Sequence, residues 1–134
     1  MEFVVWHSSY CIGDPKVDRQ HQELVKLLNL LHKKIHSGCS NKIIDEVLIQ
    51  LINYAENHFR DEEELMQRIN YPEYEEHRAE HERLVLEVFD FKRRYEQKKV
   101  SKYDLLLFLR DWLVDHIIGT DLKIKNWLLR LGLI

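Results

Sequence analysis

The amino-acid sequence predicts an all-α protein: an antiparallel up-down four-helix bundle with an N-terminal arm and a short C-terminal helical extension. Three observations predict this fold class. Helical periodicity of apolar residues runs through almost the whole chain, whereas the alternation typical of strands is nearly absent. The four glycines and two prolines fall between the long periodic stretches rather than within them. The connections are short, which makes consecutive helices antiparallel neighbours.

Four long helices are expected at 18–37, 41–69, 73–98 and 101–118, with a further helical stretch at 121–131. Gly38 is a candidate C-cap, and Ser40 is a candidate N-cap for the helix that follows. Pro72 stops one helix and suits the first turn of the next. Ser101 with Asp104 three residues later resembles a capping box. Each connection therefore has the turn chemistry that a helix boundary requires.

Length and charge restrict the class of protein further. A chain of 134 residues predicts one domain over 1–134, in which residues 1–17 form an ordered arm along the bundle. Its 20 Lys+Arg and 23 Asp+Glu are interspersed, which argues against a nucleic-acid partner or an anionic membrane surface. No apolar run reaches the roughly 20 residues that span a bilayer. The N-terminal residues lack the basic segment of a signal peptide, so a cytoplasmic protein is expected.

Each expected helix carries a regular inward-facing stripe, and each stripe is interrupted where it should be apolar. The interrupting residues are His21, His58, Glu62, His77, His81 and His116. Because consecutive helices run in opposite directions, all six fall at the same end of the bundle. Burying such groups unpaired costs free energy at each position. Five imidazoles and a carboxylate at one level therefore indicate a metal site.

The spacing of these residues suits metal coordination. Residues four apart share a helix face, so His58 with Glu62, and His77 with His81, each present two ligands side by side. Taken alone, any one of these histidines is more simply a satisfied core or surface residue, and Glu62 an exposed one. As a set, with Asp121 added, they exceed the four ligands of one zinc ion and the capacity of one octahedral ion, so two ions are implied. Mixed nitrogen and oxygen donors favour iron or manganese.

Asp121 can join the set only if the helix around it is irregular. Five residues at 100° each would turn Asp121 about 140° away from His116 on an ideal helix. A π-bulge would absorb the extra residue. The alternative is a helix that ends at Gly119 as C-cap and restarts with Thr120 as N-cap. The apolar stripe continues on both sides, which favours the bulge.

Several segments match a known pattern: Val17-Asp18-Arg19-Gln20-His21, the stretch from His58 to Met66, Tyr71-Pro72 followed by His77-Arg78-Ala79-Glu80-His81, and Trp112 to His116 continuing to Asp121. On these segments the chain resembles the hemerythrin family, specifically its single-domain bacterial members. The resemblance implies an oxo- or hydroxo-bridged di-iron centre that binds O2 without haem. It also implies three roles: one iron held by His77, His81 and His116, the other by His21 and His58, and both bridged by Glu62 and Asp121.

By the same resemblance, Phe59, Trp112, Leu113 and Ile117 line an apolar ligand pocket; ordinary core packing is the other interpretation. The expected function is reversible O2 binding for storage, delivery or sensing, without catalysis. The alternative is a di-iron enzyme that handles peroxide or nitric oxide at the same open iron position. Glu63 lies five residues after His58 and off the stripe, so it is not expected to be a ligand.

Overall fold

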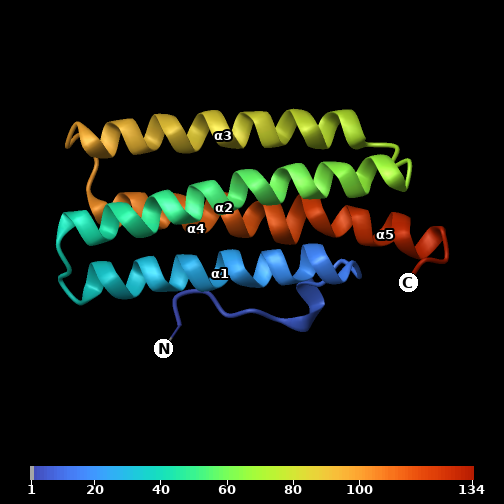
Figure 1. Cartoon of the computed structure of the whole chain (residues 1–134), viewed down its shortest axis with the longest axis horizontal. Helices are drawn as coiled ribbons and strands as arrows, with labels where there is room; N and C mark the ends of the chain where they lie inside the picture. Colours follow the sequence, from blue (N-terminus) through green and yellow to red (C-terminus); the bar gives the residue numbers. More distant parts are fainter. Residues whose placement is uncertain (1) are drawn as a thin grey trace.

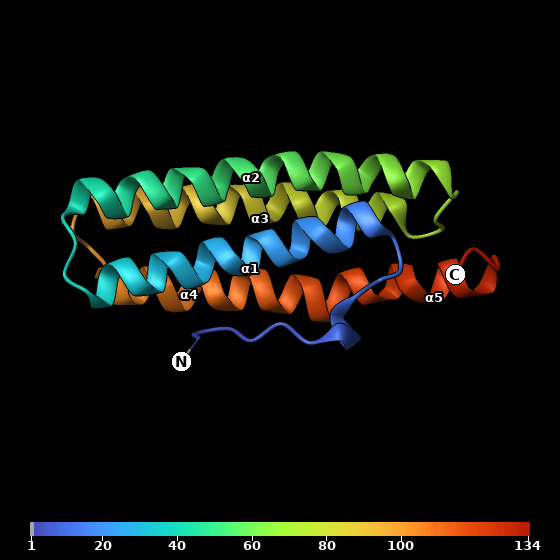
Figure 2. The ribbon, with the colours of Figure 1, turned by 60° about the horizontal axis from the view of Figure 1, so that its bottom comes forward.

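The computed structural model describes residues 2–134 and confirms the four-helix bundle (Figure 1). The elements are the 3₁₀ turn Ser8–Tyr10, α1 (Pro15–His36), α2 (Asn41–Arg68), α3 (Tyr74–Glu96), α4 (Lys102–Asp115), the π-helix His116–Asp121 and α5 (Leu122–Arg130). α1 packs against α2 and α4, and α3 packs against the same two, so the four antiparallel helices form a square (Figures 1 and 2). Within residues 2–134 there is no strand, and no helix is both long and apolar enough to cross a membrane.

The helix starts follow from local capping. Asp14 accepts a hydrogen bond from the Val17 amide at 3.1 Å, with Pro15 at the first helical position, so α1 begins three residues earlier than expected. The capping box predicted for α4 is confirmed: the Asp104 amide donates to Ser101 Oγ, and the Ser101 amide donates to the Asp104 carboxylate, both at 3.0 Å. The predicted N-cap of α2 also forms, since the Ile43 amide donates to Ser40 Oγ, whereas the Asp14 cap was not predicted.

The connection between α2 and α3 differs from the sequence prediction. Pro72 lies in the turn and not in the first turn of α3, which begins at Tyr74. Asn70 reverses the chain with a φ of 51°, and Tyr71 is buried, so the connection needs the residues up to Glu73 before a helix can restart. The wider turn carries Tyr71 and Glu73 to the end of the bundle where the histidines gather.

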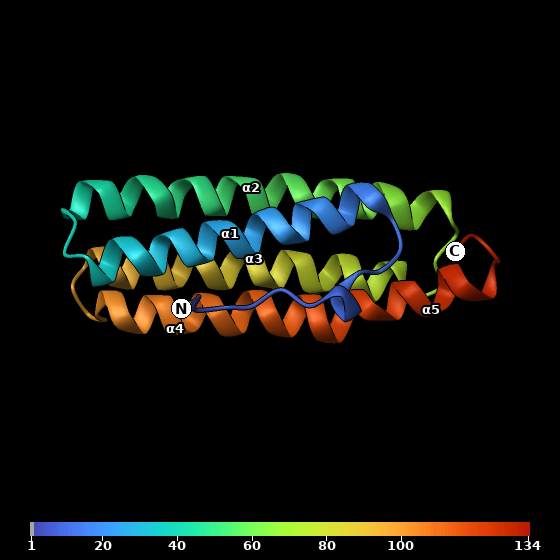
Figure 3. The same cartoon turned by 90° about the horizontal axis from the view of Figure 1, so that it is seen from below.

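The N-terminal arm is ordered along the bundle, as expected (Figure 3). The Asn29 side chain on α1 pairs with the backbone of Val4 in both directions, at 2.8 and 2.9 Å. Asp18 accepts hydrogen bonds from the amides of Ile12 and Gly13 at 2.7 and 3.1 Å. Trp6 packs against the main core between these two attachments. The arm thereby covers one side of the bundle.

The core consists of two apolar clusters with a polar layer between them. The main cluster fills the bundle from the α1–α2 connection as far as Phe59, Leu113 and Ile117. The smaller cluster, at the other end, contains Ile12, Val17, Leu65, Met66, Tyr71, Ile124 and Leu128. Along α1, for example, His21 falls between Val17 of the smaller cluster and Leu24 of the main one. The interruptions of the four stripes therefore form one layer.

Candidate metal centre

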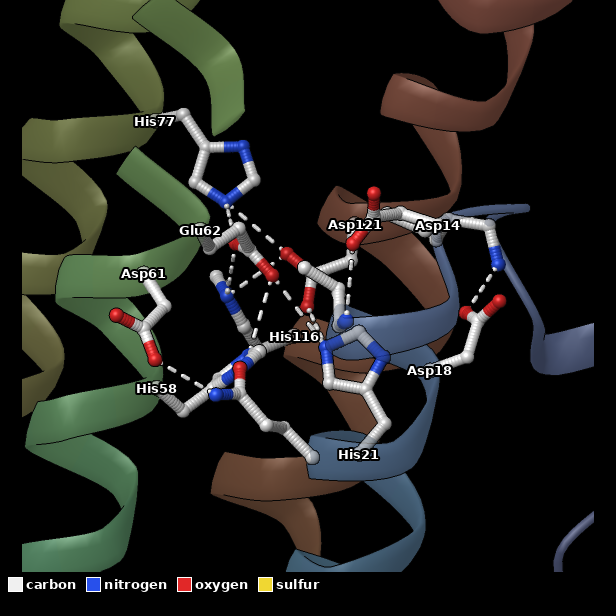
Figure 4. Close-up of polar contacts among 12 residues, drawn as sticks. Asp14, Asp18, His21, His58, Asp61, Glu62, His77, His116 and Asp121 are labelled. Carbon is white, nitrogen blue, oxygen red and sulfur yellow. Dashed lines mark hydrogen bonds and ion pairs between the residues drawn. The ribbon is translucent and has the colours of Figure 1, made fainter. Parts of the chain in front are cut away.

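The structure brings together all seven side chains that the sequence singles out as ligands. None is more than 4% exposed: His21, His58, Glu62, His77, His81, His116 and Asp121. They come from α1, α2, α3 and the π-helix, and Figure 4 shows six of them directed toward a common centre. The donor atoms form two groups, each with its atoms within 4.8 Å of one another: His77, His81 and His116 with both carboxylates, and His21 and His58 with the same two carboxylates.

Glu62 directs one carboxylate oxygen to each group. Its Oε1 lies 2.7 Å from His77 Nε2 and 3.1 Å from His81 Nε2. Its Oε2 lies 3.1 Å from His58 Nε2 and 3.3 Å from His21 Nε2 (Figure 4). A carboxylate in this position can bridge two cations.

Asp121 is divided in the same way. Its Oδ1 lies 2.9 Å from His116 Nε2 and 3.0 Å from His77 Nε2, and its Oδ2 lies 2.9 Å from His21 Nε2. The π-helix His116–Asp121 makes this possible, which confirms the bulge preferred from the sequence. A residue five positions on lies about one turn later in a π-helix, so Asp121 and His116 share a face. Gly119 has no positive φ and does not end a helix.

The donor atoms are arranged for a metal rather than for one another. Among residues 2–134, no hydrogen-bond partner exists for Nε2 of His21, His58 or His77, for Glu62 Oε2, or for either oxygen of Asp121. The nitrogen–oxygen distances are short, but the lone pairs and N–H bonds are not aligned for hydrogen bonds. Buried polar atoms without partners are costly and uncommon. Imidazole and carboxylate donors that converge in two groups therefore fit a pair of metal ions.

Electrostatics in the metal-free centre favour protons in place of cations. Burial opposes a charge on His21 and on His77, but the Asp121 and Glu62 carboxylates outweigh it and raise the pKa of each imidazole to about 9. The same carboxylates raise the pKa of His116. For His58 burial prevails and lowers the pKa. The imidazoles hold the pKa of both carboxyl groups below the ordinary value despite burial.

Outside the seven, Gln20 supports His58. The Nδ1 of His58 donates to Gln20 Oε1 at 2.7 Å, while the amide nitrogen of Gln20 donates to Asp61 at 2.7 Å. The second bond fixes which end of the amide faces His58, and so directs the unprotonated Nε2 to the centre. This role of Gln20 was not predicted from the sequence, although Gln20 directly precedes His21 on the matching segment.

Two glutamates anchor histidines of the other group. His81 Nδ1 donates to Glu63 Oε2 at 2.8 Å, and His116 Nδ1 donates to Glu80 Oε2 at 3.1 Å. The bond from His116 lowers the pKa of Glu80 to about 2 despite its partial burial. Glu63 is not a member of either donor group, as expected, but it orients a member of one. The signal for both glutamates was their position adjacent to Glu62 and His81.

The four residues expected to line a ligand pocket are all buried in the main cluster. The Phe59 ring stacks on His81, with centroids 4.2 Å apart and planes at 11°, and lies 5.9 Å from the Trp112 ring. The Trp112 indole N–H donates to the Leu84 carbonyl at 2.9 Å, so no polar atom of this side chain is left unpaired. Leu113 and Ile117 belong to the same cluster. That the four form a ligand pocket stays a prediction.

The family described as the hemerythrin HHE cation-binding domain matches residues 13–128. The chain belongs to the hemerythrin family. A bacteriohemerythrin from Stenotrophomonas maltophilia is 31% identical over 121 residues, covering 90% of this chain and 78% of the relative. A hemerythrin-like protein from Naegleria gruberi is 29% identical and covers 90% of each chain. A crystal structure of wild-type hemerythrin superposes with a TM-score of 0.81 at 29% identity, covering 94% of this chain and 98% of the other. Hemerythrin domains bind a di-iron centre, and the seven-residue cluster is able to hold it.

Proposed function

We propose that this hemerythrin holds two iron ions in the seven-residue cluster and binds O2 reversibly. His77, His81 and His116 would hold one ion, His21 and His58 the other, and Glu62 and Asp121 would bridge them. The observation that carries this proposal is the orientation of the carboxylates, each with one oxygen at each histidine group. This orientation of the carboxylates fits two adjacent metal ions and does not fit a single ion.

The two histidine groups are unequal, and this inequality supports ligand binding. With the bridging carboxylates shared evenly, the group of His21 and His58 offers one donor fewer than the group of three. A six-coordinate ion on that side keeps a position for an added ligand. When bound, a ferrous pair supplies the two electrons that O2 binding requires.

The surroundings of the cluster favour a small apolar ligand. Trp6 of the arm lies 6.5 Å from His21 between ring centroids and covers the two-histidine side. Phe59 and Leu113 are both buried on the side of the main core. A buried site with apolar surroundings admits a diatomic gas far more readily than a charged or bulky substrate.

The polar residues next to the cluster support binding rather than catalysis. Gln20, Glu63 and Glu80 each hold the Nδ1 of a histidine. Gln20 is a neutral amide with no proton to transfer, and either glutamate would have to give up its bond to the ring in order to accept one. Among residues 2–134, the buried polar atoms at the centre without a hydrogen-bond partner all belong to proposed ligands.

The test is an oxygenation cycle. We expect purified protein to contain two irons per chain, and anaerobic reduction followed by air to produce oxo-to-iron charge-transfer bands that disappear when O2 is removed. His58→Ala or His77→Ala should lose metal or bind it weakly, because each removes a ligand from one ion. A single tetrahedral zinc in protein expressed with ample iron would contradict the proposal. Irreversible oxidation with rapid turnover of peroxide or nitric oxide would favour the enzyme instead.

A further inference from the structure

The cluster is closed to solvent, so a cation must enter by displacing a side chain. The three histidines of the larger group each line a groove at the surface of the bundle. In two of these grooves the histidine is anchored, that is, its Nδ1 donates a hydrogen bond to a carboxylate. His81 is held by Glu63 and covered by the stacked Phe59, and His116 is held by Glu80. The third groove, of about 300 Å³, ends on His77.

His77 is the one ring of this group without an anchor. Its Nε2 faces Glu62 and Asp121, and its Nδ1 lies on the other side of the ring (Figure 4). The side chain is 3% exposed, yet Nδ1 has no hydrogen-bond partner among residues 2–134. A ring without this second attachment can rotate away from the cluster at lower cost than His81 or His116.

The groove in front of His77 is lined by carboxylates from the start of α3. Glu73, Glu76 and Glu80 fall on one face of the helix, and Thr120 completes the opposite wall. The Tyr71 hydroxyl donates to Glu73 at 3.0 Å and holds that carboxylate at the groove. Lys123 at the rim is the one lysine or arginine among the lining residues.

Glu73 and Glu76 are available to a cation. Both are exposed, and neither forms an ion pair within the described part of the chain. Glu75, in the same turn, is instead paired with Arg78 at 3.3 Å. Two unpaired carboxylates beside an unanchored, buried imidazole offer oxygen donors at the surface and a nitrogen donor behind them.

We propose that this groove is the route by which Fe²⁺ reaches the centre, with Glu73 and Glu76 as transient ligands and His77 as the gate. The inference rests on the proposed function, since it supplies the metal that the cluster would hold. The carboxylates attract the cation and bind it weakly through oxygen. The His77 ring then rotates outward, releases its Nε2 proton to solvent, takes the cation on Nε2 and returns with it to the cluster.

Metal uptake by the metal-free full-length chain tests the route. Co²⁺ is the probe, because its visible absorption bands report coordination as it occurs. We expect the double variant Glu73→Gln/Glu76→Gln to take up Co²⁺ at least threefold more slowly than wild type, with the same final two ions per chain. Raising the ionic strength should slow wild type more than the double variant. Glu75→Gln, which removes one neighbouring carboxylate charge in the same turn, should load at the wild-type rate.

A second probe reports the groove independently of the cluster. Tb³⁺ prefers carboxylate oxygen, and Tyr71 in the groove wall can sensitise its luminescence. With Zn²⁺ present to fill the cluster, we expect emission from wild type and Glu75→Gln and its loss in the double variant. Unchanged Co²⁺ uptake, or unchanged emission, in the double variant would overturn the route. A wild-type chain that binds fewer than two Co²⁺ would refute the proposed function, and Tb³⁺ would still decide whether the groove binds a cation.

Discussion

At the scale of the residue, the orientation of each imidazole in the cluster depends on the hydrogen-bond partner of its Nδ1. His58, His81 and His116 each donate from Nδ1 to a polar side chain, whereas His21 and His77 do so to none of residues 2–134. An anchored ring is held with its Nε2 aimed at the centre before any metal arrives. Affinity should therefore depend on anchors that never contact the metal.

Removing the anchor of His58 tests this dependence. Gln20→Ala should lower the affinity for the second metal ion by about 10–100-fold while the bundle stays folded, because the ring loses its fixed tautomer and orientation. Competition with a chelator measures the change, and circular dichroism checks the fold. Gln50→Ala, an exposed position of the same residue type on α2, is the control. Equal affinity in both variants would show that Gln20 does not position His58.

Leu113 tests the apolar pocket. Leu113→Ala should admit water and shorten the life of the oxygenated protein severalfold, in addition to a cavity cost of about 2–5 kcal/mol. The decay of the charge-transfer bands gives the rate. Leu105→Ala removes an equally buried leucine two turns away in α4 and should lower stability without speeding the decay. If both variants decay alike, Leu113 contributes packing alone.

The sequence revealed the ligands because each stands where an apolar residue belongs. His21 and Glu62 break stripes whose other members are mostly buried apolar residues, so their position conflicts with their polarity. Gln20 and Glu80 raise no such conflict, since polar residues are normal on the outer side of a helix. Nothing in the pattern separates them from solvated neighbours. Their role is visible only in the structure, where the Nδ1 of His58 points at Gln20 and that of His116 at Glu80.

At the scale of the element, the π-helix is the feature that completes the site. Periodicity predicted it, because the apolar stripe of α4 resumes after His116 with one residue too many. The boundaries were less exact: α1 begins three residues before its expected start, and Pro72 lies in the turn before α3, since it fits both a turn and a first helical turn. Spacing thus fixed the irregularity within a long helix better than the boundary between two helices. Core packing on both sides of the π-helix restricts its backbone, whereas the residues of a connection between two helices can adopt more conformations.

Gly119 distinguishes the π-helix from a broken helix. Its φ is not positive and an added Cβ would meet nothing within 4 Å, so Gly119→Ala should stabilise the protein by about 0.5–1 kcal/mol. Gly38 has equal space but a φ of +73°, so Gly38→Ala should destabilise by about 1–2 kcal/mol. Chemical denaturation of the metal-loaded variants measures both. A destabilising Gly119→Ala would mean that the helix ends at this glycine.

At the scale of the whole molecule, the bundle encloses a polar layer between two apolar clusters. Burying the seven side chains without metal costs folding free energy, because most of their atoms that face the centre lack a hydrogen-bond partner among residues 2–134. Bound metal would satisfy these atoms and so stabilise the fold as well as the site. We expect the metal-free chain to unfold at a lower temperature than the loaded one in a calorimetric scan. Equal melting temperatures would contradict this coupling.

The pH dependence of that difference follows from the imidazoles. His21 and His77 have a folded-state pKa of about 9 against an ordinary 6.5. A raised pKa contributes stability that is complete below pH 6.5 and is lost as the pH rises through 9. His116 acts in the same direction, and His58, with its lowered pKa, acts in the opposite one.

The metal-free chain should therefore lose stability between pH 6.5 and 9, because the three imidazoles with a raised pKa lose their protons there, whereas the effect of His58 falls at or below pH 6.5. In the loaded chain these nitrogens bind metal instead of protons, so its melting temperature should change little over the same range. The stabilisation by metal then grows with pH, and loading at pH 7.5 should release protons that a pH-indicator dye detects. A metal-free melting temperature that is level from pH 6 to 9 would show that the centre does not hold these protons.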